Sequence, residues 1–286
     1  TRLVSDWSSD VCSSDLWTLA PSGSEIVISA SERFAGAIYS LRWKGKEFLD
    51  AADHGRLLQS ASNFDAGTPI TNETYNPTEG GSRRDGDGPT STSKLIRVRA
   101  KGNVLETSSA MAFWLNPGEE SEGNPAKNTT PLSEHLLDKK VIVGFRGNPR
   151  RIRYEVTFRL PRGETHGQAV FESLTGYMPA EFSRFYRQNP TTYRLEPLDD
   201  GPGEQERPVV FSTEDGAYAM GIYSPDPAPK GYGRFRFDWA RVVKWNCVFR
   251  VKNPRPGGRY RYQHDVLVGT RAQVEEDLAR LAKGQR

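Results

Sequence analysis

The chain has 286 residues, of which 36% are hydrophobic, 26% charged and 10% aromatic, and its formal net charge is +3. A chain of this length can form one large β domain or two smaller domains. Its nearly balanced charge argues against a nucleic-acid-binding protein. No run approaches the ~18 apolar residues of a membrane-spanning helix. Neither nucleic acid nor membrane is therefore expected as a partner.

The first sixteen residues do not resemble a folded segment or a secretory signal. They lack a basic region, an apolar region and a small-residue cleavage site. Residues 6–16 repeat Ser-Ser-Asp and resemble one reading frame of a common sequencing-library adapter. We predict that residues 1–16 are a non-native segment on a metagenomic reading frame and that 17–286 form a single domain. Localisation and oligomeric state are not predicted.

From residue 17 onward, apolar and polar residues alternate in short runs, which is the pattern of half-buried β-strands. The clearest runs are 151–160, 243–251 and 260–269. Shorter strands are predicted at 25–29, 37–43, 95–100, 111–115, 139–145, 168–174, 209–212 and 217–223. Glycine-rich turn clusters separate many of these runs.

One helix is predicted, at 270–283. Thr270 can cap it, and Gln273 follows at the spacing of a capping box. Its apolar stripe consists of Val274, Leu278 and Leu281. Many strands followed by a single terminal helix predict an all-β fold, built as a large antiparallel β-protein.

Two polar segments, 57–89 and 116–138, interrupt the strand rhythm and are predicted to be loops that carry binding residues. The first contains the residue types that a sugar site uses, namely polar donors for hydroxyls and an aromatic face for ring C–H groups. The predicted sugar-binding residues in and beside it are Arg56, Gln59, Tyr75 and Asn76. The alternative is a structural role, in which Arg56 pairs with Asp53 or Glu79 and Asn76 caps a turn.

The acid/base candidates come from one glutamate and four histidines. Glu79 is predicted to be the general base, and His54 or His264 the general acid. His264 shares its strand face with apolar residues, so a core role is its alternative. His135 falls in the second polar segment and is a candidate lid residue, whereas His166 is expected in a solvated turn.

A polar row is predicted on the strand at 243–251. Lys244, Asn246 and Arg250 share one face of this strand, and Trp245 lies on the other. Such a row suits the wall of a sugar site, so Lys244 and Asn246 are predicted to bind substrate. The alternative is an ordinary solvent-facing strand.

No metal or other cofactor is predicted. The histidines lack His-x-His or His-x₃-His spacing. With residues 1–16 set aside, Cys247 is the only cysteine, which excludes an intramolecular disulfide and a cysteine-based zinc site. Cys247 lies in an apolar run and is predicted to be a core residue.

The extended opening at 35–43, the Gly55-Arg56 pair, the many long strands and the chain length together resemble the galactose mutarotase-like (aldose 1-epimerase-like) superfamily. This resemblance implies a β-supersandwich with an open sugar-binding face, in which Arg56 contacts sugar hydroxyls. Two features of the family have no match. Thr-Glu-Gly-Gly at 78–81 stands where His-Gly-Gly is expected, and 175–179 contains no histidine where a mid-chain proton donor is expected.

Residues and resemblance together predict a carbohydrate-active protein, namely an aldose 1-epimerase-like enzyme that uses general acid/base catalysis. A base would take the anomeric hydroxyl proton while an acid protonates the ring oxygen. One alternative is a polysaccharide lyase or other uronate-acting enzyme, in which Arg56 and Asn76 neutralise the carboxylate and His54 or Tyr75 takes the C5 proton. The other is a non-catalytic glycan-binding module. The partner is a mono-, oligo- or polysaccharide, and the sequence does not select among them.

Overall fold

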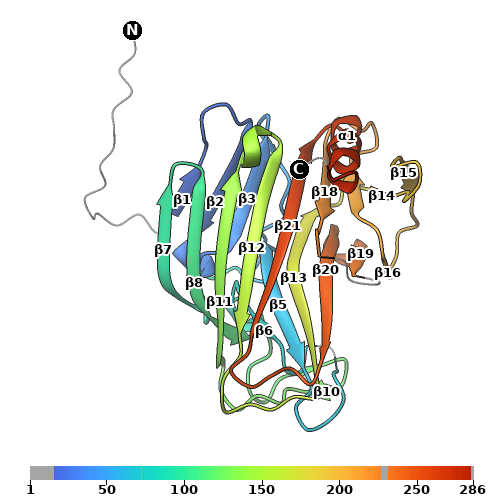
Figure 1. The fold of residues 1–286 in the computed structure, drawn as a ribbon. Helices are drawn as coiled ribbons and strands as arrows, with labels where there is room; N and C mark the ends of the chain where they lie inside the picture. The colour runs from blue at the N-terminus through green and yellow to red at the C-terminus, as the bar shows by residue number, and fades with distance from the viewer. Residues whose placement is uncertain (1–15, 72, 227–230, 285–286) are drawn as a thin grey trace.

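The computed structural model describes residues 16–71, 73–226 and 231–284. The predicted adapter-like segment lies outside the described residues except for Leu16, which begins strand β1. The described strands form two antiparallel layers, which Figure 1 shows one behind the other.

The first layer contains the strands that carry the site described below. In pairing order it consists of β1 (Leu16–Leu19), β2 (Ile26–Ser31), β3 (Ile38–Trp43), β5 (Leu58–Phe64), β13 (Gln168–Pro179), β20 (Val242–Lys252), β19 (Tyr232–Phe237) and β16 (Gly203–Gln205). The short strand β4 (Lys46–Glu47) pairs with β3.

The second layer covers the inner face of the first. In pairing order it consists of β7 (Lys94–Lys101), β8 (Val104–Phe113), β11 (Leu132–Val143), β12 (Arg151–Arg159), β21 (Arg259–Gly269), β18 (Ala219–Tyr223), β17 (Val209–Ser212), β14 (Arg184–Gln188) and β15 (Leu195–Pro197). Strand β6 (Pro77–Thr78) pairs with β5 and β8 and so joins the layers. Strands β9 (Glu120–Ser121) and β10 (Asn124–Pro125) form a separate hairpin.

The core lies between the two layers and follows from the alternation in the sequence. On β12, Ile152, Tyr154, Val156 and Phe158 are buried. On β20, Trp245 and Phe249 point into the same core. The three clearest predicted strands correspond to β12, β20 and β21, with ends within one residue of the predicted ones.

The predicted terminal helix is confirmed as α1 (Arg271–Ala282). The Thr270 hydroxyl accepts from the Gln273 backbone N–H at 3.3 Å, and the Gln273 side chain accepts from the Thr270 N–H at 3.0 Å. The apolar stripe of the helix packs against Val210, Ala219 and Leu267 of the second layer. No helix in the described part of the chain is long and apolar enough to cross a membrane.

The two predicted loop segments both contain strands, which corrects the prediction. Segment 57–89 includes β5, and segment 116–138 runs into β11, so that His135 lies on a strand. Strand β5 lacks a clear alternation of apolar and polar residues, because several of its buried residues are polar. These side chains can be buried because partners elsewhere in the fold satisfy their hydrogen bonds. Ser60, for example, donates to the backbone carbonyl of Ser173 at 2.8 Å.

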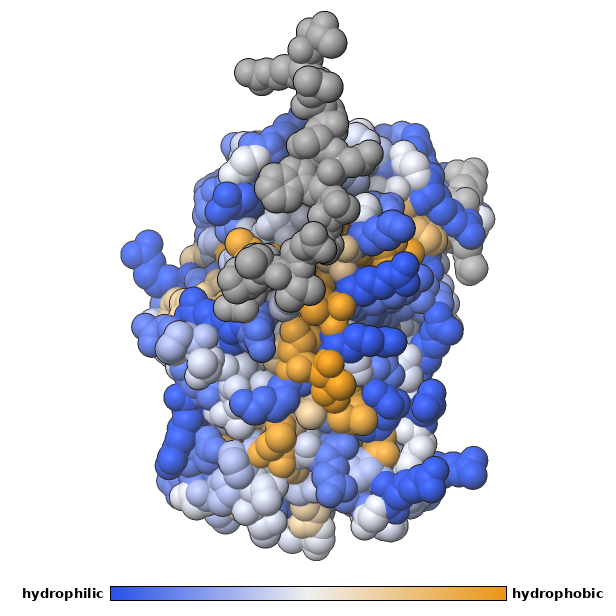
Figure 2. All heavy atoms as spheres, turned by 90° about the vertical axis from the view of Figure 1, so that its left-hand side faces the viewer, coloured by the Kyte–Doolittle hydropathy of each residue, from blue (hydrophilic) through white to orange (hydrophobic). Residues whose placement is uncertain are grey.

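Strands β1 and β7 lie on one side of the molecule, the left-hand side of Figure 1. Figure 2 shows a stripe of apolar side chains on this side, bordered by hydrophilic ones. Ile96 of β7 and Leu16 of β1 are 58% and 48% exposed. Neither strand contributes to the pocket described next.

Candidate functional site

A pocket of about 370 Å³ opens over β5, β13 and β20, on the face of the first layer that points away from the core. This volume lies in the range of small-molecule sites, roughly 300–1,000 Å³. Side chains from the segments 73–78 and 114–122 border it. The two predicted loop segments therefore contribute to the pocket, together with three strands.

Strand β20 supplies the polar row that the sequence predicts. Lys244, Asn246 and Arg250 line the pocket, whereas Trp245 and Cys247 are buried behind them. Burial raises the pKa of the Cys247 thiol, so the thiol stays protonated and unreactive. Cys247 is thus a core residue, as predicted.

A β-bulge in β13 aims its side chains into the pocket. The pairing of β13 with β20 shifts register between Glu172 and Leu174, and the pairing with β5 shifts between Glu172 and Thr175. Ser173 and Leu174 both turn to the interior, so Glu172, Thr175 and Tyr177 all line the pocket. Bulges are over-represented beside functional sites because they re-aim side chains in this way.

Glu172 and Lys244 form an ion pair on the floor of the pocket. Lys244 Nζ lies 2.7 Å from Glu172 Oε1, which also accepts from the Asn246 amide at 3.1 Å. Burial alone would raise the pKa of Glu172, but the Lys244 charge and these hydrogen bonds bring that pKa below its usual range. The carboxylate is therefore ionised and can accept hydrogen bonds from ligand hydroxyls.

Aromatic side chains surround this ion pair. Lys244 Nζ lies 5.1 Å from the ring centroid of Tyr177 and 5.5 Å from that of Phe235, which are cation–π distances. Trp114 lines the pocket on the side of β5. Across from Asn246 on the neighbouring strand, Gly233 leaves room for the amide, because a Cβ there would collide with its oxygen.

Carboxylates outnumber cations around the pocket. Those lining it belong to Glu73, Glu122, Glu172 and Glu204, and the cations belong to Lys244 and Arg250. Arg250 pairs with Glu204 at 2.8 Å. Four carboxylates against two cations leave a net negative pocket, which is unfavourable for a polyanionic ligand.

Four of the predicted binding residues meet in this pocket: Gln59, Asn76, Lys244 and Asn246. The side chain of Gln59 donates to the Gly55 carbonyl at 2.7 Å and accepts from the Gly80 N–H at 2.8 Å. The Asn76 amide donates to a β5 carbonyl at 2.6 Å. Both amides are therefore held rigidly by the backbone beside the pocket.

Tyr75 and Arg56 lie elsewhere. Tyr75 packs edge-on against Phe113, with ring centroids 4.6 Å apart, and is not among the pocket-lining residues. Arg56 pairs with Asp53 at 2.9 Å and approaches Asp50 at 3.7 Å, and it does not line the pocket either. Arg56 thus forms the ion pair with Asp53 that is the structural alternative to sugar binding.

Glu79 lies in the interior between the layers, where it has no exposed side-chain area. Its carboxylate pairs with Lys139 of β11 and accepts from the Ser60 backbone N–H at 3.0 Å and the Tyr154 hydroxyl at 3.4 Å. A carboxylate enclosed in this way cannot reach a ligand in the pocket. Neither Glu79, the predicted base, nor Arg56, the predicted binding residue, lines the pocket.

Both candidate acids are also buried. His54 has each ring nitrogen against a backbone carbonyl, Gly86 O at 2.7 Å and Arg33 O at 2.9 Å. His264 hydrogen-bonds to the Ser173 hydroxyl at 2.9 Å from the core side of β21. Among the residues that the structure describes, no histidine lines the pocket.

The remaining two histidines depart from their predicted surroundings. His135 and His166 are 2% and 8% exposed, so His166 is not solvated. Both hydrogen-bond to the same oxygen of Glu164, at 2.9 Å and 3.0 Å. This cluster lies outside the pocket lining.

The sequence predictions omit four prominent pocket residues: Glu172, Tyr177, Trp114 and Phe235. The first two lie on β13, where consecutive apolar residues at 169–171 obscure the alternation, so the sequence does not show which residues face the pocket. For Phe235, the alternation of arginine and aromatic residues at 234–237 indicates the strand that is observed as β19. Nothing local indicates Trp114, because a loop carries it.

No protein-family model matches the sequence, and no curated protein matches it. Solved structures do match. A galactose mutarotase related enzyme from Lactobacillus acidophilus aligns at a TM-score of 0.51 and 9% identity, over 89% of this chain and 97% of its own. A galactose mutarotase-like protein from Lactobacillus casei aligns at 0.50 and 10% identity, over 88% of this chain and 99% of its own.

A candidate aldose 1-epimerase from Klebsiella pneumoniae aligns at a TM-score of 0.50 and 11% identity, over 95% of this chain and 84% of its own. Identities this low establish the fold and leave function to the site itself. The fold expected from the resemblance is confirmed. The chain shares the fold of these structures, a large antiparallel β-supersandwich, and ends in one C-terminal helix.

Proposed function

We propose that this chain binds a neutral sugar in the pocket over β5, β13 and β20. The observation that carries the proposal is the hydrogen-bonded group of Glu172, Lys244 and Asn246. The rings of Tyr177 and Phe235 flank this group. Charged and amide groups of this kind bind sugar hydroxyls, and aromatic faces pack on ring C–H groups.

The charge of the pocket selects among the sugar classes. Four carboxylates and two cations line it, so a uronate would meet a surplus of like charge. A neutral aldose or a neutral oligosaccharide avoids this repulsion and can donate hydroxyl hydrogens to Glu172. The pocket charge therefore favours a neutral sugar over the anionic polymer of the lyase alternative.

Anomer interconversion is the chemistry we propose for this pocket, with Glu172 and Tyr177 as the proton-transfer pair. Ionised Glu172 would take the proton of the anomeric hydroxyl as the ring C–O bond breaks. Burial raises the pKa of Tyr177, so its phenol keeps a proton that it can donate to the ring oxygen. Reversal with the anomeric centre turned over would give the other anomer and restore both groups.

The binding proposal is tested by titrating the full chain with neutral aldoses, neutral oligosaccharides and uronates, with affinities measured by NMR. Neutral sugars should bind more tightly than uronates. Asn246→Ala should weaken binding about tenfold, since the variant loses the amide that hydrogen-bonds to the Glu172–Lys244 pair beside the sugar. Arg56→Ala, outside the pocket, is the matched control. Tighter binding of uronates, or equal losses in the two variants, would contradict the proposal.

The catalytic step is tested separately, by exchange NMR of the anomers of whichever aldose binds. Glu172→Gln should reduce the exchange rate by about 10²–10⁴-fold, the usual contribution of a positioned acid or base. Tyr177→Phe should reduce it as well. Binding without accelerated exchange in the unmodified chain would leave a sugar-binding module and exclude the epimerase.

A further inference from the structure

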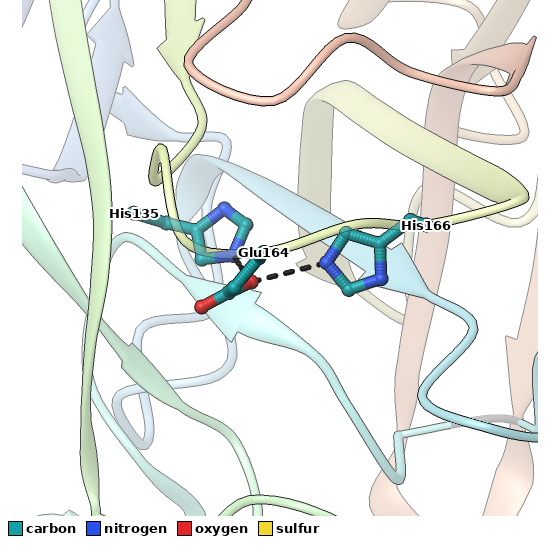
Figure 3. A group of neighbouring side chains, drawn as sticks. All are labelled: His135, Glu164 and His166. Carbon is teal, nitrogen blue, oxygen red and sulfur yellow. Dashed lines mark hydrogen bonds and ion pairs between the residues drawn. The ribbon is translucent and has the colours of Figure 1, made fainter.

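His135, Glu164 and His166 form a compact cluster at the end of β5, separate from the sugar pocket. His135 belongs to β11, whereas Glu164 and His166 lie in the loop between β12 and β13. Figure 3 shows the Glu164 carboxylate between the two imidazole rings, with a nitrogen of each ring turned toward it. One ligand atom from each of the three residues lies within 4.8 Å of the other two.

Each imidazole is held in place by its surroundings. The Phe64 ring packs against both, with centroids 4.6 Å from His135 and 4.7 Å from His166. Nδ1 of His166 donates to the backbone carbonyl of Asp65 at 2.5 Å. The Asp65 carboxylate in turn accepts two backbone N–H groups, of Gly167 at 2.9 Å and Gln168 at 3.0 Å. The loop that carries Glu164 and His166 is therefore fixed to the end of β5.

This support resembles the surroundings of a metal-binding histidine. Such a histidine commonly donates one ring N–H to a carbonyl or carboxylate, which fixes the tautomer and leaves the other nitrogen free to ligate. Nδ1 of His166 is engaged in this way, and its Nε2 is turned toward Glu164 Oε2 at 3.0 Å. Nε2 of His135 approaches the same oxygen at 2.9 Å.

We propose that His135 Nε2, His166 Nε2 and the Glu164 carboxylate bind a divalent transition-metal ion, with Zn²⁺ as the best-fitting class. Two imidazoles and one carboxylate are a ligand set that suits zinc and leaves a fourth position open. Tetrahedral ligation at ~2.0–2.2 Å needs donor atoms about 3.3 Å apart. The two nitrogen–oxygen distances, 2.9 Å and 3.0 Å, thus have to lengthen by a few tenths of an ångström. The side chain of Glu164, the most exposed of the three, can move to allow this.

The metal site would also brace the wall of the pocket. Tyr75 packs against His166, with ring centroids 5.7 Å apart. Its neighbours in the loop, Glu73 and Asn76, line the pocket. The backbone N–H of Phe64 donates to the Tyr75 carbonyl at 3.1 Å. An ion that links the three side chains would therefore reduce the freedom of a loop that borders the pocket.

The first experiment uses the unmodified full chain, stripped with a chelator and titrated with Zn²⁺. Competition against a chromogenic chelator should give one ion per chain. Histidine side-chain nitrogen NMR should show shifts at His135 and His166 on binding. His54 and His264, which lie outside the cluster, are internal controls and should not shift. No stoichiometric binding, or shifts confined to His54 or His264, would overturn the proposal.

The second experiment compares three variants by the same competition. Glu164→Gln and His166→Gln should each weaken Zn²⁺ binding on the order of 100-fold, since even loss of an outer partner costs 10–100-fold. Glu134→Gln is the matched control, because Glu134 adjoins His135 on β11 and is exposed. Equal affinity in all three variants would contradict the site. If His166→Gln does not fold, Glu164→Gln and the histidine NMR of the unmodified chain still decide.

Discussion

Two Glu–Lys ion pairs in this chain have the same chemistry and opposite surroundings. Glu79 and Lys139 pair in the interior with no exposed side-chain area, whereas Glu172 and Lys244 pair in the pocket with 14% and 15% exposed. The interior pair connects β11 to the segment after β6, and its carboxylate has only protein partners. The pocket pair shares its carboxylate with Asn246 and faces the ligand space. Burial, and not residue type, therefore separates a structural glutamate from a candidate catalytic one.

The largest expected effect comes from breaking the interior pair. Lys139→Met leaves Glu79 as an uncompensated buried charge, which should lower the free energy of unfolding by about 3–5 kcal/mol. Urea denaturation measures this loss. The double variant with Glu79→Gln should recover most of the stability, because no buried charge remains. A single-variant loss below ~1 kcal/mol would show that Glu79 is solvated or has another cation.

Acid should destabilise the interior next. Burial, helped by the nearby Arg153 charge, lowers the pKa of His264 from 6.5 to about 3. Between these values the unfolded chain binds a proton that the folded chain does not, so stability falls as pH falls below 6.5. This group alone should cost about 2 kcal/mol between pH 7 and pH 5.

Denaturation of the unmodified chain and of His264→Gln at both pH values measures that contribution. The variant lacks the titrating group, so its stability should change less with pH while the remaining groups titrate alike. Parallel pH profiles for the two proteins would mean that folding does not lower the pKa of His264.

Breaking the pocket pair should cost less stability than breaking the interior pair, and it should also weaken sugar binding. Lys244→Met should cost only about 1–2 kcal/mol of stability, because Glu172 keeps the Asn246 hydrogen bond and some exposure to solvent. The same variant should reduce sugar affinity about tenfold. Denaturation and sugar titration of one preparation test both statements. A stability loss equal to that of Lys139→Met would remove the distinction between the pairs.

Arg56→Ala should have the smallest effect. Its ion pair with Asp53 is partly exposed, so its loss should cost at most about 1 kcal/mol. Sugar affinity should not change, since Arg56 does not line the pocket. Sugar titration of Arg56→Ala and Lys244→Met under the same conditions compares their affinities. A tenfold loss of affinity would return Arg56 to the binding role that the superfamily resemblance implies.

The pocket and the interior differ in how much of each can be predicted from the sequence. The polar row of β20 follows from alternation alone, and Lys244 and Asn246 do line the pocket. Glu79 and His54 have equally polar neighbours in the sequence, yet tertiary hydrogen bonds enclose both. Even the double glycine at 80–81 serves internal packing. A Cβ at Gly80 would collide with the side chains of Leu57 and Gln59. The space that this glycine leaves is therefore filled by the protein itself and not by a ligand.

The sequence by itself determined the antiparallel strands, the capped terminal helix and the outward row of β20. These features depend on periods of two and 3.6 residues, which any short window contains. The tertiary structure alone decided which glutamate meets the pocket and which histidines meet Glu164. His135 and His166 are brought together by strand pairing and a loop, and Glu172 and Thr175 share a face because of one bulge. Register and bulges are set by contacts between distant strands, so no local pattern encodes them.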